Sequence, residues 1–151
     1  MLLLSVATLI ATLGSLTAKY FADHFLIHRI PIIGNFAGLQ LVHNPGIAFG
    51  IAFPPIVQEL LIGMALVIVA IMAAKTLRHS KNSTYPLPTT HYSLAFGLIL
   101  GGGLANILDR IPDGFVTDFF QVGSFPVFNV ADSCITVGVV LLLLMMVQKK
   151  E

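Results

Sequence analysis

The chain has 151 residues, of which 56% are hydrophobic and only 10% charged, with a net charge of +1 and a mean hydropathy of +0.92. A hydropathy this high excludes a soluble globular domain of this size and indicates a membrane protein. The eight Lys and Arg residues are spread along the chain and form no basic face, so we expect no nucleic-acid partner. The single cysteine, Cys134, excludes an intramolecular disulfide bond.

Four apolar runs are long enough to cross the roughly 30 Å hydrocarbon core of a bilayer. They lie at approximately 1–19, 56–74, 91–109 and 128–147. We therefore predict an α-helical polytopic membrane protein with four transmembrane helices, in which residues 1–151 form a single domain. We expect the first run to stay in the mature protein, because the positively charged region that begins a cleavable signal peptide is missing.

The insert between the first two runs, residues 20–55, has a different pattern. Prolines and glycines break it into short segments that no continuous helix would tolerate. Residues 36–42 partly alternate between apolar and polar side chains, and HNPG at 43–46 has the chemistry of a turn, so we expect a small antiparallel sheet here. Residues 110–127 are predicted to form a loop.

The basic residues predict the orientation of the chain. They follow the second and fourth apolar runs, at Lys75, Arg78, Lys81, Lys149 and Lys150. Since cytoplasmic loops carry the excess of Lys and Arg, we expect both termini in the cytoplasm and both the insert and the 110–127 loop outside.

Polar side chains gather at the outer ends of the third and fourth runs. Asn106, Asp109 and Arg110 share one helix face, and Asn129 and Asp132 are three residues apart at the start of the last run. Taken singly, Asp109 and Arg110 could be an interfacial ion pair and Asn129 an N-cap.

An ionised side chain in hydrocarbon costs roughly 2.5 to 3.5 kcal/mol, so these groups need partners, water or a chemical task. Together with Asp118, the acids place three carboxylates outside one membrane face. Two carboxyl groups that share a site cannot both be ionised, because their like charges repel. One of them would therefore hold a proton while the other activates water. The pattern therefore predicts acid–base hydrolysis of an amide.

Other functions have weaker support in the sequence. Intramembrane carboxylates also occur in ion-coupled transporters, but no inverted repeat of the apolar runs is visible. A non-catalytic assembly protein, held together by the small residues Gly97 and Gly101, is a third possibility. The five His residues are scattered and no H-E-x-x-H motif is present, so we expect neither a metal nor another cofactor.

Four motifs occur in a particular order and spacing: HNPGIAFG (43–50), GGGLANILDR (101–110), GFVTDFF (114–120) and FPVFNVADS (125–133). In these motifs the chain resembles the lipoprotein signal peptidase family, also called signal peptidase II, over nearly its whole length. The resemblance implies an intramembrane aspartyl protease, an aspartic endopeptidase of the bacterial inner membrane with its active site toward the extracytoplasmic leaflet. Its substrates would be diacylglyceryl-modified prolipoproteins, cut immediately before the lipidated cysteine.

The resemblance also implies particular partners and an extracytoplasmic β-cradle between the first and second helices. The partners are membrane lipid and inhibitors of the globomycin type. With the site at the outer leaflet, we expect acyl chains to enter between helix faces lined by Gly102 and Leu104.

Residue roles follow from the same resemblance. Asp118 and Asp132 match the family's catalytic dyad. Four further residues match polar positions that line the site: Asn44, Asn106, Arg110 and Asn129. Structural support is expected from Lys19, Gly46 and Asp109, with Asp109 orienting Arg110.

Two positions depart from the family pattern. Ser15 stands where an acidic residue usually precedes Lys19 by one helical turn, so a pair between these two positions is not expected. Ala105 replaces the glycine that usually precedes the site asparagine, and its methyl group is expected to shift the third helix slightly.

Overall fold

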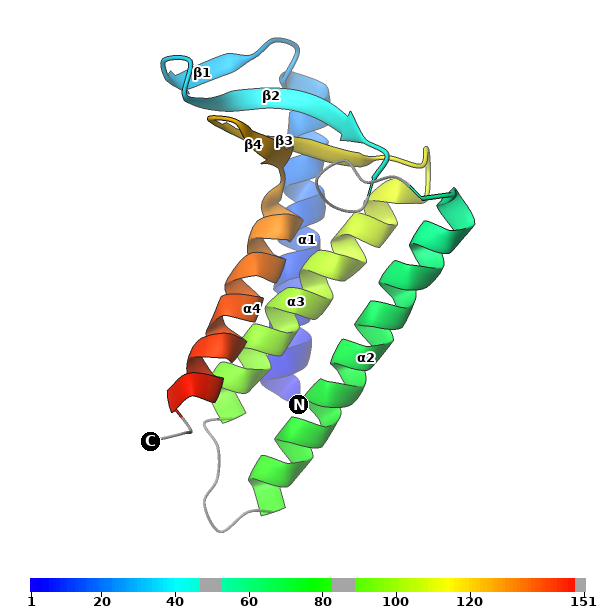
Figure 1. The fold of residues 1–151 in the computed structure, drawn as a ribbon, viewed down its shortest axis with the longest axis vertical. Helices are drawn as coiled ribbons and strands as arrows, with labels where there is room; N and C mark the ends of the chain where they lie inside the picture. Colours follow the sequence, from blue (N-terminus) through cyan, green and yellow to red (C-terminus); the bar gives the residue numbers. More distant parts are fainter. Residues whose placement is uncertain (47–52, 83–88, 149–151) are drawn as a thin grey trace.

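The computed structural model describes residues 1–46, 53–82 and 89–148. Its helices are α1 (Leu2–Phe25), α2 (Pro55–Asn82), α3 (Thr89–Arg110) and α4 (Val130–Gln148), and its strands are β1 (Ile30–Ile33), β2 (Ala37–Asn44), β3 (Val116–Val122) and β4 (Phe125–Phe128). Figure 1 shows the four helices as one bundle with the sheet across one end, while the N-terminus and the end of α4 lie at the other.

Four helices in the described residues are long and apolar enough to cross a membrane. In the most apolar stretch of each helix, only 11% of the residues are buried in α2 and in α4 and 17% in α1, against 56% in α3. Such exposed apolar surface belongs in hydrocarbon, which confirms the prediction of a polytopic helical membrane protein. The contrast also makes α3 the central helix of the bundle.

Three consecutive glycines let α3 pack closely on all three neighbours. A Cβ atom on Gly101 would lie 2.5 Å from the backbone oxygen of Thr8 in α1, one on Gly102 would collide with the carbonyl of Ala131 in α4, and one on Gly103 with Leu66 in α2. Successive helical residues point about 100° apart, so three glycines in a row open three directions. Gly97, one turn before Gly101, also packs closely on α1, where a Cβ on it would meet Ala7.

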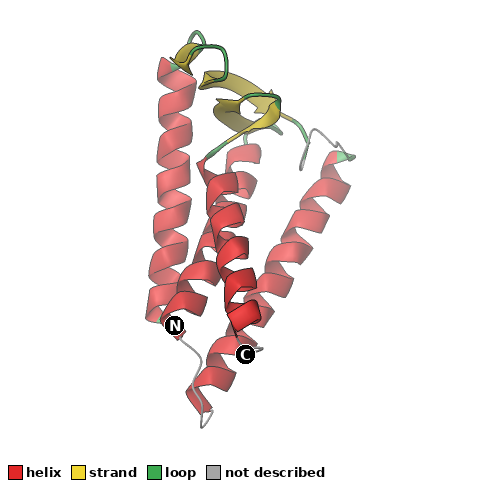
Figure 2. Ribbon diagram, turned by 60° about the vertical axis from the view of Figure 1, so that its left-hand side comes forward, coloured by secondary structure: helices red, strands yellow, loops and turns green. Residues whose placement is uncertain are grey.

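The sheet is antiparallel, with the order β1-β2-β3-β4. Figure 2 shows it lying over the end of the bundle. The two strands in the insert confirm the small sheet expected there. The prediction of a loop over 110–127 was wrong, because β3 and β4 form a hairpin around Gly123, whose φ of 53° suits a tight turn.

The ends of the helices also differ from the predicted spans. Helix α1 continues six residues past position 19, because Lys19 and Asp23 form an ion pair one turn apart that favours the helix. Helix α2 continues eight residues past position 74, to Asn82, and the first turn of this extension contains the good helix formers Lys75, Leu77 and Arg78. Helix α4 begins at Val130 rather than at 128, because Phe128 pairs with Phe120 in the sheet.

The glycine contacts predict a stability difference between two matched variants. In Gly101→Ala the new methyl group must push α1 away from α3, which we expect to cost about 1–3 kcal/mol. A Cβ on Gly63 in α2 meets nothing within 4 Å, so Gly63→Ala should be neutral or stabilise by up to about 1 kcal/mol. Thermal unfolding in detergent, followed by circular dichroism, measures both. Equal melting temperatures for the two variants would contradict this account of the packing.

Candidate active site

Asp118 lies in the middle of β3, paired with Val42 of β2, and its side chain is 1% exposed. Two side-chain amides hold its carboxylate. Asn44 Nδ2 donates to Oδ2 at 2.9 Å, and Asn129 Nδ2 donates to Oδ1 at 2.9 Å. The sheet therefore places this acid, and amides from β2 and from the start of α4 fix its orientation.

Asn129 also caps α4 and connects the two acids. Its Oδ1 accepts the Asp132 N–H at 2.9 Å, and its own N–H donates to Asp132 Oδ2 at 3.2 Å, a reciprocal capping arrangement. Its Nδ2 donates to Asn106 Oδ1 at 3.1 Å, and Asn106 Nδ2 donates to Asp132 Oδ1 at 2.9 Å. The predicted N-cap is thus confirmed, and two amides link Asp118 to Asp132.

The surroundings of Asp118 change its acidity. The pKa of Asp118 is raised to about 6, mainly by burial and also by the negative charges of Asp132 and Asp109. The hydrogen bonds from Asn44 and Asn129 favour the ionised form and hold this pKa down. Asp118 can therefore gain or lose a proton near neutral pH.

A groove of about 600 Å³ opens beside these acids, bordered by α2, α3, α4 and β4. Its polar lining contains Asn44, Asn106, Arg110, Asp118 and Asp132. Its apolar lining includes Ile62, Ile135, Val137 and the four residues of β4. The groove can therefore hold a chain with both a polar and an apolar part.

The expectation that Gly102 and Leu104 line the path of the acyl chains was wrong. Gly102 packs against Ala131 of α4, and it is Gly103 that borders the groove. Leu104 points to the outer surface, where it is 41% exposed. Residues next to each other on a helix face different directions, so a single position decides which one lines the groove.

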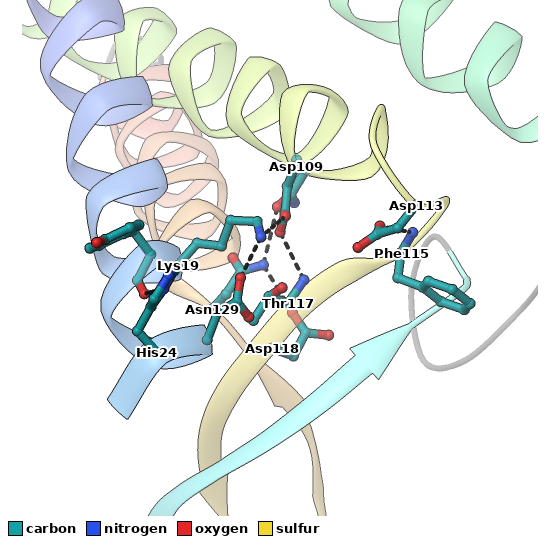
Figure 3. Close-up of polar contacts among 11 residues, drawn as sticks. Lys19, His24, Asp109, Asp113, Phe115, Thr117, Asp118 and Asn129 are labelled. Atoms are coloured by element: carbon teal, nitrogen blue, oxygen red, sulfur yellow. Dashed lines mark hydrogen bonds and ion pairs between the residues drawn. The ribbon is translucent and has the colours of Figure 1, made fainter. Parts of the chain in front are cut away.

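Asp109 and Arg110 take separate partners, so the expectation that Asp109 orients Arg110 was wrong. Asp109 Oδ2 accepts the backbone N–H of Thr117 at 2.8 Å, and its Oδ1 lies 3.2 Å from Lys19 Nζ (Figure 3). Arg110 Nη2 donates to the Gly46 oxygen at 2.8 Å, and its Nη1 lies 3.6 Å from Glu59 Oε1. The two side chains diverge because they are consecutive on the helix.

Lys19 has acidic partners on two helices. It is paired with Asp109 on α3 and with Asp23 one turn further along α1. The acid that Ser15 does not supply before Lys19 is therefore supplied after it. Ser15 is buried, and its hydroxyl donates to the Ala11 oxygen at 2.7 Å. This ion-paired cluster lies behind β3, and its bond to Thr117 holds the residue that precedes Asp118.

Comparison with known proteins bears on this arrangement. The family model described as "Signal peptidase (SPase) II" matches residues 6–148. The chain belongs to the signal peptidase II family. The motif resemblance is thereby confirmed.

Several relatives of this family are lipoprotein signal peptidases. That of Dehalococcoides mccartyi strain BAV1 is 44% identical over 104 residues, 69% of this chain and 62% of the relative. That of Pelodictyon phaeoclathratiforme is 36% identical, with 95% of this chain and 88% of the relative covered. That of Syntrophus aciditrophicus is 35% identical, with 99% and 94% covered. The match thus spans less than two thirds of the first relative and most of the other two.

Two solved structures share the fold. Both are of bacterial membrane enzymes determined by the in meso method, at 2.3 and 1.9 Å resolution. The first has a TM-score of 0.72 at 24% identity and covers 97% of this chain and 88% of its own. The second has a TM-score of 0.67 at 25% identity, with 93% and 90% covered.

In this signal peptidase II chain the structure brings together six of the predicted site residues: Asn44, Asn106, Arg110, Asp118, Asn129 and Asp132. Gly46 joins them through Arg110, whereas Lys19 and Asp109 form the separate cluster. Sequence reasoning missed the contacts of Asp23, Gln58 and Glu59. Each left a signal: Asp23 follows Lys19 by four residues, and the other two are polar residues at the start of an apolar helix.

The raised pKa of Asp118 predicts how stability depends on pH. Folding raises this pKa from its ordinary value of 3.8 to about 6. The protonated acid therefore favours the folded state, and this contribution is fully present below pH about 4 and lost as the pH rises through about 6. Relative to Asp118→Asn, the wild type should lose at most about 3 kcal/mol between those limits.

Melting temperatures of both proteins in detergent, from pH 4 to 7.5, measure this loss. The substitution also carries a pH-independent cost, because its new amide nitrogen faces the donors Asn44 and Asn129. Only the change of the difference with pH is therefore informative. A difference that stays constant over this range would contradict the raised pKa.

Proposed function

We propose that this chain is an aspartic endopeptidase that removes the signal peptide of diacylglyceryl-modified prolipoproteins by cutting immediately before the lipidated cysteine. One observation carries the proposal: Asp118 and Asp132 line the same groove and are connected through the amides of Asn129 and Asn106. Membership of the signal peptidase II family supports a protease, and relatives named lipoprotein signal peptidase support the substrate class.

The chemistry follows from two coupled carboxyl groups that share one proton. Asp118, with its raised pKa, holds the proton, and the Asp132 carboxylate accepts a proton from water. The water oxygen attacks the carbonyl carbon of the scissile amide while Asp118 donates its proton to the carbonyl oxygen. Asp132 then passes its proton to the amide nitrogen, Asp118 takes a proton back from one hydroxyl of the tetrahedral intermediate, the C–N bond breaks, and the signal peptide leaves with a new carboxyl group.

The remaining polar residues hold the acids and the peptide. Asn44 and Asn129 fix Asp118, and Asn106 fixes Asp132. Arg110 borders the groove; its Nη1 lies 3.6 Å from Glu59 Oε1, and its Nε is buried without a hydrogen bond among the described residues. A buried donor such as Nε needs an acceptor, which a carbonyl oxygen of the bound peptide would supply.

The proposed placement in the bacterial membrane uses the charge distribution. Lys75 and Arg78 lie near the end of α2, at the opposite end of the bundle from the sheet. We infer that this end is cytoplasmic, so both termini are inside and the groove opens toward the extracytoplasmic leaflet. The lipidated part of a precursor anchored in that leaflet could then reach the apolar lining of the groove.

The proposal makes the two acids essential for cleavage. We expect Asp118→Asn and Asp132→Asn each to lower turnover by roughly 10²- to 10⁴-fold, because an amide cannot exchange the proton. Asp113→Asn is the matched control, since Asp113 is an exposed acid in the turn before β3. Cleavage of a lipidated precursor peptide by purified protein, followed by mass spectrometry, measures all three. Near-wild-type turnover by either dyad variant would remove that acid from the mechanism.

The apolar lining predicts a requirement for lipid. Each buried methylene contributes about 0.8 kcal/mol, so burial of only four lowers the free energy of binding by about 3 kcal/mol. We therefore expect kcat/KM for a precursor without the diacylglyceryl group to be at least about 100-fold lower than for the lipidated one. Matched peptides assayed in the same nanodiscs measure the ratio. Equal cleavage of both would leave a protease without selection for lipoproteins.

A further inference from the structure

Gln58 is a buried polar residue in the first turn of α2. It is 2% exposed and, with Asp118, is one of the two largest fully buried side chains in the part of the chain that the structure describes. A buried amide is costly unless both of its polar ends are bonded. Gln58 Nε2 donates to the Pro45 oxygen at 2.9 Å, and its Oε1 accepts the Phe53 N–H at 3.4 Å. Both polar ends of this side chain are therefore hydrogen-bonded to backbone groups, one at Pro45 and one at Phe53.

Pro45 is the residue next to Asn44, whose amide holds Asp118. Asn44 Oδ1 accepts the Gly46 N–H at 2.8 Å, and this bond turns Nδ2 toward Asp118 Oδ2. The Gly46 oxygen is in turn held by Arg110 Nη2 at 2.8 Å. The turn that orients Asn44 is thus fixed from two helices, by Gln58 of α2 at Pro45 and by Arg110 of α3 at Gly46.

The sheet alone does not fix this turn. The pairing of β2 with β3 ends at Asn44 opposite Val116, so Pro45 and Gly46 lie beyond the last paired residue. Proline has no backbone N–H, which leaves its carbonyl as the only backbone group of Pro45 that can form a hydrogen bond. The bond from Gln58 uses that group.

We propose that Gln58 is a positioning residue for Asp118: by holding Pro45, it keeps the Asn44 amide against the Asp118 carboxylate. The proposal deepens the function proposed above and rests on it wherever cleavage is the readout. It gives α2 an influence on the acid that acts through Pro45 and Asn44, although α2 contributes neither of the two carboxylates.

The charges around Asp118 give the direction of the effect. Burial raises its pKa most, Asp132 from α4 and Asp109 from α3 raise it as well, and the Asn44 bond lowers it. Arg110 from α3 borders the same groove. Loss of the Gln58 contact would loosen the Asn44 bond and raise the pKa of Asp118 further.

A double-mutant cycle tests the proposal. Gln58→Met keeps the length of the side chain but removes both hydrogen bonds, and Gln40→Met, at an exposed position of β2, is the control. Each is measured in the wild type and in Asn44→Ala, with the lipidated precursor peptide. We expect Gln58→Met to lower kcat by about five- to tenfold, as for loss of one hydrogen bond, and to change KM by less than about twofold.

In the Asn44→Ala background the same substitution should lower kcat by less than about twofold, because the residue through which it acts is gone. Gln40→Met should have no effect in either background. An equal fall of kcat in both backgrounds, or an effect confined to KM, would overturn the proposal.

A second variant, Gln58→Glu, covers the case in which Gln58→Met does not fold. While the introduced carboxyl is protonated it can still donate to Pro45 and accept from Phe53, whereas the ionised carboxylate cannot donate. Relative to the wild type, kcat of Gln58→Glu should therefore be close to normal at low pH and fall as this carboxyl ionises. A ratio that does not change with pH would overturn the proposal.

The titration of Asp118 itself separates this proposal from the proposed function. Infrared difference spectra report its protonated carboxyl, which is identified by the band that Asp118→Asn loses. This band should titrate at higher pH than in the wild type in Gln58→Met, and also in Gln58→Glu once the introduced carboxyl has ionised. An unchanged Asp118 titration in the variants overturns the role of Gln58. Absence of cleavage by the wild type, with the shifted titration still present, would instead overturn the protease assignment alone.

Discussion

The hydrogen bonds of one side-chain amide, that of Asn129, connect the three parts of the molecule that form the site. Its nitrogen donates to Asp118 in the sheet and to Asn106 on α3, while its oxygen caps α4 and so fixes Asp132. Every polar end of this side chain is used, which is what burial at 5% exposure requires. Displacement of the sheet from α4 would break the hydrogen bond from Asn129 to Asp118, so the geometry of the site depends on the docking of the sheet on the bundle.

That docking depends in turn on the central helix. In a membrane, helices gain little from burying apolar surface against each other, so association relies on close packing and on polar contacts. Helix α3 supplies both. Its glycines admit α1, α2 and α4, and its last turn carries Asp109 toward α1 and β3 and Arg110 toward α2 and the Gly46 turn. The two charged residues at the end of α3 thus hold the strand that carries Asp118 and the turn that orients Asn44.

Much of this arrangement could be predicted from the sequence. The four helices follow from apolar runs whose length is set by the bilayer, and the cap by Asn129 follows from its position three residues before Asp132. The strands β3 and β4 were missed because the run of apolar and aromatic residues around Asp118 does not alternate clearly. The partner of Asp109 was missed because only the packing of α1 on α3 brings Lys19 to it. The partner of Gln58 was missed because only the turn of the insert brings Pro45 to it. Local spacing identifies which residues share a helix face, but not which distant element meets that face.

The central claim is that Asp118 and Asp132 activate water rather than attack the peptide themselves, and isotope labelling tests it most directly. Enzyme and lipidated precursor are mixed in H₂¹⁸O under single-turnover conditions, and the released signal peptide is analysed by mass spectrometry. Direct attack by water predicts one ¹⁸O atom in the new carboxyl group of the peptide and none in the enzyme. Unlabelled peptide together with ¹⁸O in an aspartate side chain would mean that a carboxylate had formed a covalent intermediate, and would contradict this account.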